Sequence, residues 1–343
     1  MRPRWGALSL CLVLVGAANQ ALATDGGSVA GLRRALAVAE TRAGKASPQL
    51  LPLLDRLAGA QTDDGALADA AKSRRRALKI ALASFGGDSS DTANAMIALA
   101  QVNLLRHDYF AAEPLLTLAT NVLTAKLGAD SPALIQPLAG LGRLALDRGD
   151  LDSAEQFARR AMALAPHDPT HSTEPLRVIG AVDAAREHYD EGEAVLSQAI
   201  STDRHYHGDN SEETARSLAQ LANLLLRAKR FNEALRPIEQ AIAIDQARLG
   251  PTHPLITDDF CDLGLIYSGL NRDQDAAEML SYAIGLLDQG NAGGTARMAY
   301  AELDLAGVLH TMGYDKAANA VFNDGKHILN AAGKADRDHE REL

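Results

Sequence analysis

The sequence predicts an all-α protein, folded as an α–α superhelix of about seven helical hairpins with a half repeat at the N-terminus. Two observations predict this fold. Small and apolar residues recur at a step of 42 residues, and the chain is rich in apolar residues but poor in aromatic ones, 47% against 4%. No alternation of apolar and polar residues competes with the helical pattern.

Three columns of residues recur with successive steps of 42, 42, 38, 42, 42 and 42. The first helix of each hairpin, helix A, carries an apolar marker followed by alanine or glycine. The second, helix B, carries two small residues seven positions apart. Small residues at these positions allow two helices to cross closely. The markers are Leu57, Leu99, Leu141, Ile179, Leu221, Leu263 and Leu305. The first helix-B column is Ala70, Ala112, Ala154, Gly192, Ala234, Ala276 and Ala318, and the second is Ala77, Ala119, Ala161, Ala199, Ala241, Ala283 and Gly325.

The pattern Leu-Ala-x-Leu-x-x-x-x-Gly-x-Tyr, followed by two alanines seven residues apart, resembles the tetratricopeptide repeat. The 42-residue length and the segments Leu249–Pro254 and Tyr109–Pro114 resemble the kinesin-light-chain type of that family. The paired asparagines of that type are missing, so its ligand contacts do not carry over. The residues at the position of the family's turn glycine are Gly65, His107, Gly149, Glu187, Lys229, Asn271 and Gly313.

The turn signals divide the chain from residue 24 to residue 331 into repeats. Residues 28–43 repeat helix B alone and are expected to cap the first hairpin. The charged residues 332–343 are expected to form a frayed tail. The hairpins are predicted at 47–85, 89–127, 131–165, 172–206, 211–249, 253–289 and 294–331.

One step is four residues short, and the loss falls in the linker Ala165–Pro175. Pro166 is expected to end the preceding helix, because proline lacks an N–H and clashes with the previous turn. Two interpretations remain open. The superhelix either bends between its third and fourth hairpins, or a surface loop absorbs the change in length.

Residues 1–23 have the features of a secretory signal. Two arginines precede the apolar run Leu8–Ala18, and Ala21–Ala23 is a small-x-small cleavage site before Thr24. The run is too short for a regular membrane-spanning helix, although a retained short anchor is the alternative. The sequence therefore predicts export, into the periplasm of a bacterium.

The chain is acidic, with 34 basic and 44 acidic residues and a formal charge of −10. Residues 1–23 contain Arg2, Arg4 and no acid, so removing them changes −10 to −12. Such a charge argues against nucleic acid and anionic membranes as partners. Cys261 is the only cysteine after residue 23, so no internal disulfide is expected, and this thiol is expected to act as a small apolar filler.

A candidate binding surface follows from the helical period. At 100° per residue, the polar positions of helix A lie opposite the apolar ones. The resemblance implies that this face lines a concave groove. The residues predict that the middle of the groove is basic and its C-terminal end acidic, and its arginines are expected to bind a carboxylate of an acidic partner or of a peptide C-terminus. The other interpretation is an ordinary solvated face. The predicted groove residues are Asn94, Gln101, Arg143, Arg177, Arg216, Gln220, Asn223, Arg227, Asp258, Asp262 and Asp304.

No motif in the sequence predicts catalysis or a cofactor. Phosphate-binding loops, a nucleophile elbow and paired-histidine zinc motifs are absent from the sequence. The predicted function is an exported, non-catalytic scaffold or assembly factor that binds protein or peptide. The main alternative is a regulatory or sensor subunit for a small anionic ligand. An enzyme that uses the His205/His207 loop is a second alternative, although these histidines have no obvious third metal ligand.

Overall fold

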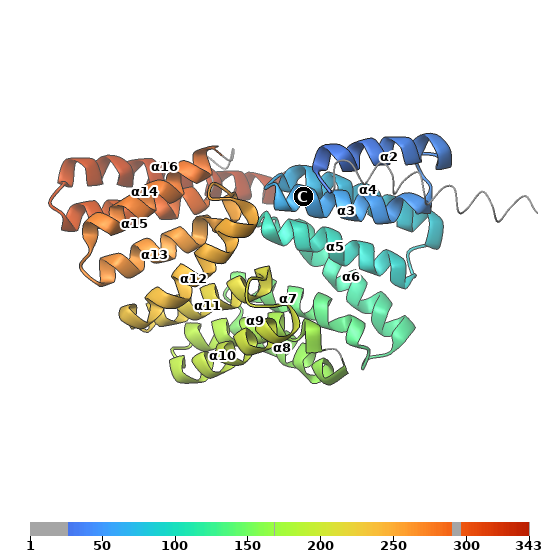
Figure 1. Cartoon of the computed structure of the whole chain (residues 1–343), viewed down its shortest axis with the longest axis horizontal. Coiled ribbons are helices and arrows are strands. Elements are labelled where there is room, and N and C mark those ends of the chain that lie inside the picture. Colours follow the sequence, from blue (N-terminus) through green and yellow to red (C-terminus); the bar gives the residue numbers. More distant parts are fainter. Residues whose placement is uncertain (1–26, 168, 290–295, 343) are drawn as a thin grey trace, which may run out of the picture. The chain divides into compact units, whose positions relative to one another are not determined.

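The computed structural model describes residues 27–167, 169–289 and 296–342 (Figure 1). Helices and turns make up the described residues, with no strand among them, which confirms the predicted all-α repeat fold. The chain divides into two compact units, Met1–Leu144 and Ala145–Leu343. The predicted signal at 1–23 lies outside the described residues.

From residue 27 on, the first unit consists of a single helix followed by hairpins. Its helices are α2 (Val29–Ala43), α3 (Leu51–Asp63), α4 (Leu67–Phe85), α5 (Ser90–Leu105) and α6 (Tyr109–Leu127). Short 3₁₀ turns at Pro48–Leu50 and Pro132–Leu134 precede α3 and α7 (Ile135–Asp147). The boundary between the two units falls within the sequence of α7.

Helix α2 covers the first hairpin. Its Leu32 and Leu36 are buried in a cluster with Leu50, Leu54 and Leu57. The cluster buries apolar side chains that the first hairpin would otherwise expose to water. The helix therefore acts as the terminal cap expected of a solenoid.

The second unit contains the end of α7 and the helices α8 (Leu151–Leu164), α9 (Thr173–Ala185), α10 (Tyr189–Tyr206), α11 (Glu212–Arg227), α12 (Phe231–Leu249), α13 (Thr257–Gly269), α14 (Asp273–Gln289), α15 (Ala296–Thr311) and α16 (Asp315–Glu342). Successive helices pack on each other. Contacts also join α9 to α11, α11 to α13 and α13 to α15. The A helices of the last four hairpins therefore lie beside one another.

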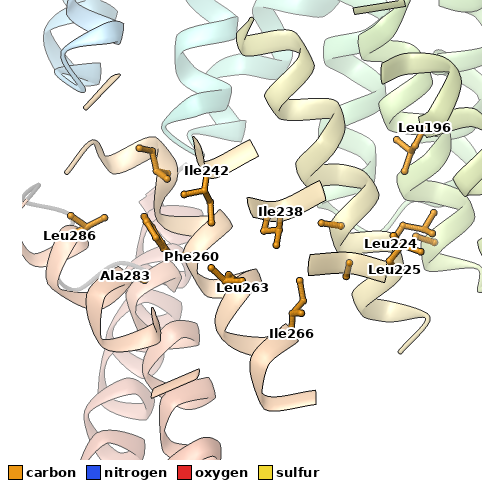
Figure 2. Packing of buried hydrophobic residues seen from close by; sticks show 14 residues of the cluster. Leu196, Leu224, Leu225, Ile238, Ile242, Phe260, Leu263, Ile266, Ala283 and Leu286 are labelled. Carbon is orange, nitrogen blue, oxygen red and sulfur yellow. The ribbon is translucent and has the colours of Figure 1, made fainter. Parts of the chain in front are cut away.

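The core of the second unit continues from one hairpin to the next (Figure 2). Ile238 of α12 and Ile266 of α13 have no exposed surface, and Leu224 of α11 is 1% exposed. Leu196 of α10 and Leu286 of α14 belong to the same cluster. Burial of these side chains is the main force that holds neighbouring hairpins together.

The small-residue columns lie where helices approach most closely. Ala112, Ala154 and Ala234 are fully buried. A Cβ added at Gly180 would lie 2.6 Å from Leu196 Cγ, and one added at Gly264 would lie 2.8 Å from Leu280 Cγ. The close crossings explain why these positions are restricted to alanine and glycine.

The turns between helices A and B share one backbone conformation. All seven turn residues have positive φ, including four that are not glycine: His107 at 55°, Glu187 at 65°, Lys229 at 59° and Asn271 at 58°. The left-handed region is costly for a residue with a side chain. The fold therefore keeps the turn even where the sequence lacks the family's glycine.

Replacing Lys229 with glycine is expected to raise the free energy of unfolding by roughly 1 kcal/mol, because glycine tolerates positive φ. Lys229→Ala is the matched control, since it removes the exposed side chain and keeps the unfavourable backbone. Equilibrium unfolding in urea measures both changes. A glycine variant no more stable than the alanine variant would contradict the explanation.

A second glycine column, which the sequence analysis missed, ends the B helices. The ψ angles at Gly44, Gly86, Gly128 and Gly250 are 152°, 168°, 165° and 155°. Their φ angles are 81–89°. Only glycine adopts this combination without large strain. Gly44, Gly86 and Gly128 are 42 residues apart, and Gly250 follows after two steps of 42 and the short step of 38, so the signal was present in the sequence.

The short linker is folded rather than extended. Helix α8 ends at Leu164, and Ala165–His167 and Pro169–His171 form two 3₁₀ turns. Pro166 lies in the first turn, so the helix ends before the proline as predicted. Helix α8 has 14 residues, against 18 in α10 and 19 in α12. The shorter α8 therefore accounts for part of the four residues by which this repeat is short. The bend in the superhelix stays a prediction.

The last helix is longer than the sequence analysis anticipates. Helix α16 continues to Glu342, through the residues expected to form a frayed tail. Alanine, lysine, arginine and glutamate make up most of 332–342, and all four have high helix propensity. Local propensity therefore favours the added helical turns.

Candidate partner-binding face

The helix-A face is defined here as the polar side of α9, α11, α13 and α15 in the second unit. Eight of the predicted groove residues belong to these four helices. The other three, Asn94, Gln101 and Arg143, belong to the first unit. Asn94 and Gln101 are exposed and lie two turns apart on α5, and Arg143 is half-buried on α7.

Arg177 does not line an open groove. Arg177 is only 6% exposed. Its Nη1 donates to Asp203 Oδ2 of α10 at 3.3 Å and to Ser217 Oγ of α11 at 3.1 Å. The other side of the guanidinium donates to Glu174 Oε2, through Nε at 3.0 Å and Nη2 at 2.5 Å. The structure therefore places Arg177 inside the fold and not at the surface of a groove, and a contact of this residue with a partner stays a prediction. The 100° rule gives the direction of a side chain on its own helix, but not the depth at which neighbouring helices bury it.

The remaining arginines of the face do not form a row of free guanidinium groups. Arg216 is exposed and paired with Glu212, one turn earlier on α11. Glu212 is also 3.2 Å from Arg248 Nη2 of α12. Arg227 is exposed at the end of α11. The predicted basic middle is thus reduced to one exposed ion pair and one terminal arginine.

The acidic end of the face is assembled from two helices. Asp258 and Asp262 of α13 and Asp304 of α15 all act electrostatically on Cys261. Burial, together with these three carboxylates, raises the pKa of the Cys261 thiol to about 12. A thiol with such a pKa stays protonated and is a poor nucleophile at neutral pH.

Asp262 interacts with both other carboxylates of the acidic end. Its Oδ2 accepts a hydrogen bond from Asn223 Nδ2 at 3.1 Å, which joins α11 to α13. Burial raises the pKa of Asp262 to about 7, and Asp258 and Asp304 add to the shift. The Asn223 hydrogen bond and the charge of Arg227 oppose it. A negative charge on Asp262 is therefore disfavoured until a cation approaches.

The sequence analysis missed two residues at the acidic end of the helix-A face, Asp259 and Arg297. Arg297 of α15 pairs with Asp258 of α13 at 2.6 Å, and burial raises the pKa of Asp259 well above its usual range. Arg297 lies eight residues before the marker Leu305, one turn beyond the positions assigned to the face. Extending the helical period by one turn would have found it.

The pKa of Asp262 predicts that stability depends on pH. Between about pH 4 and pH 7 the folded state binds a proton at Asp262 that the unfolded state has lost. The free energy of unfolding should therefore fall as pH rises through this range. Asp262→Asn should remove part of this dependence in urea titrations at several pH values. Asp190→Asn, at an exposed position of α10, is the control. Equal slopes for wild type and Asp262→Asn would contradict the assignment.

The two histidines of the candidate loop, and His253 before α13, make contacts within the fold. His207 Nε2 is 3.1 Å from the Thr170 carbonyl oxygen in the linker, and His205 packs edge-on against Tyr206. His253 Nδ1 accepts from the Leu255 N–H at 3.2 Å, as Ser47 Oγ accepts from the Gln49 N–H. Within the described residues, no group of three or more His, Cys, Asp or Glu side chains is arranged to hold a metal ion.

None of the helices in the described part of the chain has both the length and the hydrophobicity to span a lipid bilayer.

Comparison with a family model identifies part of the repeat array. Residues 104–167 and 174–247 match the model of the tetratricopeptide repeat, and these segments are tetratricopeptide repeats. Such repeats are modules of protein interaction. No match to this chain was found among curated proteins.

Solved structures show the same fold at low identity. BtubC (BKLC) from P. vanneervenii is 18% identical with a TM-score of 0.53, over 70% of this chain and 92% of that one. A Rap protein complexed with competence and sporulation factor is 11% identical with a TM-score of 0.61, over 82% and 77%. Aspartyl phosphate phosphatase F from Bacillus subtilis is 13% identical with a TM-score of 0.56, over 86% and 74%. These likenesses extend to the fold alone.

Proposed function

We propose that this chain is an exported, non-catalytic scaffold that binds a segment of a protein or peptide along the helix-A face of its second unit. The observation that carries the proposal is the side-by-side packing of α9, α11, α13 and α15. This packing brings polar side chains from separate hairpins onto one surface. Solenoids bind partners on such extended surfaces, and the solved Rap protein of this fold is in complex with a factor. The 42-residue step supports the kinesin-light-chain type of repeat.

The charges of the face suggest what the partner presents. Asp258, Asp262 and Asp304 favour a lysine or arginine of the partner opposite α13 and α15, because a cation would stabilise the disfavoured charge on Asp262. Arg216 and Arg227 favour a carboxylate opposite α11. The partner segment we propose therefore carries both signs of charge, which modifies the acidic partner expected from the sequence.

The test begins with capture of partners by the chain from residue 24 onward, using the native envelope fraction and mass spectrometry. Affinity for the captured partner is then measured for Arg227→Ala and Asp304→Asn. Each should weaken binding by about 1.5–3 kcal/mol if it makes a charge-assisted contact. Arg159→Ala, at the exposed ion pair of Arg159 with Glu155 on α8, is the control and should change binding by less than about 0.5 kcal/mol. Folded variants that bind like wild type at low and high salt would refute this face as the binding surface.

Export is tested separately on protein from the native host. The N-terminal sequence should begin near Thr24, after the small-x-small site. A chain that retains Met1 and fractionates with the cytoplasm would refute export and, with it, the use of envelope proteins as the source of partners.

A further inference from the structure

A pocket of about 460 Å³ lies in the second unit between α10, α11 and α12. Its polar lining comes from two helices. Ser197, Ser201 and Arg204 follow one side of α10 at helical spacing, and Arg236 and Gln240 lie one turn apart on α12. None of the residues that line the pocket is acidic. The pocket thus offers two guanidinium groups, two hydroxyls and an amide.

Few acidic side chains of the protein would compete with a ligand for Arg204 and Arg236. Arg236 forms no ion pair or hydrogen bond with any described residue. Arg204 is 3.5 Å from Asp209, a carboxylate whose side chain is 82% exposed and therefore well hydrated. An exposed pair at this distance contributes little energy and yields readily to a better partner. In a chain with a net charge of −10, this concentration of positive charge stands out locally.

The rest of the lining is apolar. Ile200 of α10, Leu218 and Leu221 of α11 and Pro237 of α12 contribute it. Pro237 lies inside α12, where a proline removes one backbone hydrogen bond and bends the helix. The pocket therefore lies beside the proline of α12. Its volume is within the range of sites for small molecules.

We propose that this pocket binds a small organic anion, with its carboxylate or phosphate between Arg204 and Arg236 and a short apolar part against Leu218 and Leu221. Guanidinium groups bind both head groups through paired hydrogen bonds. The site is separate from the helix-A face. Arg216 is two residues before Leu218 and five before Leu221, so it lies on the opposite side of α11.

Calorimetry on the chain from residue 24 onward tests the proposal with three probes: hexanoate, hexyl phosphate and hexanamide. At least one anion should bind, and the neutral amide should bind at least tenfold more weakly than it. The stronger anion identifies the preferred head group. Absence of binding by both anions at millimolar concentration, or equal binding of hexanamide, would overturn the proposal.

Variants locate the site. Arg236→Gln and Arg204→Gln should each weaken the bound anion by about tenfold to a hundredfold, and Arg236→Lys should restore part of the loss. Arg159→Gln, at an exposed arginine of α8 outside both the pocket and the helix-A face, is the control and should bind like wild type. Circular dichroism confirms folding. If the two pocket variants bind like wild type, or if Arg159→Gln loses as much as Arg236→Gln, the anion is not held in this pocket.

Discussion

Replacing Arg177 with alanine should lower the free energy of unfolding by about 3–5 kcal/mol. The substitution leaves Asp203, which has no exposed surface, as a buried charge without its cation. Ser217 Oγ would remain as a hydrogen-bond donor to Asp203 Oδ2 at 2.5 Å. Asp203 Oδ1 already has no partner among the described residues, so a single hydroxyl would be left to stabilise the carboxylate.

Two comparisons make this prediction specific. Arg216→Ala removes an exposed arginine from an ion pair on α11 and should cost less than about 1 kcal/mol. Adding Asp203→Ala to Arg177→Ala should recover part of the lost stability, because the uncompensated charge is removed. Urea unfolding measures the totals, and hydrogen exchange should show protection lost first in α9, α10 and α11. A cost for Arg177→Ala no larger than that for Arg216→Ala would contradict the buried network.

Replacing Ile238 with alanine should cost about 2–5 kcal/mol. Ile238 has no exposed surface and lies in the core formed by α11, α12 and α13 (Figure 2). Alanine removes three carbon atoms and leaves a cavity that close-packed neighbours fill only in part.

Ile238→Val is the matched variant and should cost about 0.5–1.5 kcal/mol. Since each hairpin packs mainly on its neighbours, exchange protection should fall most in α11–α14 and less in α8 and α16. Uniform loss of protection across the second unit would show that it unfolds as one block.

The fold was predictable from the sequence because it depends on local spacing. Close helix crossings need a small residue at one place in every hairpin. The regular spacing of Ala112, Ala154 and Ala234 therefore indicates where the helices of each hairpin cross. The turn at Lys229 shows the limit of this argument. Its left-handed backbone is imposed by the two helices that it joins, and no glycine marks it.

The binding face was only partly predictable. Asp258, Asp262 and Asp304 lie together, as the helical period suggested, because their helices are neighbours. Arg177 has the same helical phase but is buried, since Asp203 of α10 and Ser217 of α11 close over its guanidinium. That contact depends on how close α9, α10 and α11 lie to one another. The spacing of residues along one helix gives no information on this distance.

The glycines that end the B helices have a consequence for the history of the chain. Gly44, Gly86, Gly128 and Gly250 place the same backbone geometry at the same point of four repeats. A stretch of DNA that encodes one glycine to the next could be duplicated or lost by unequal recombination, and the joined ends would still meet in the conformation that the next hairpin needs. A change of chain length by whole repeats would therefore keep the backbone geometry at each junction, whereas the step that is four residues short joins α8 to α9 through two 3₁₀ turns instead.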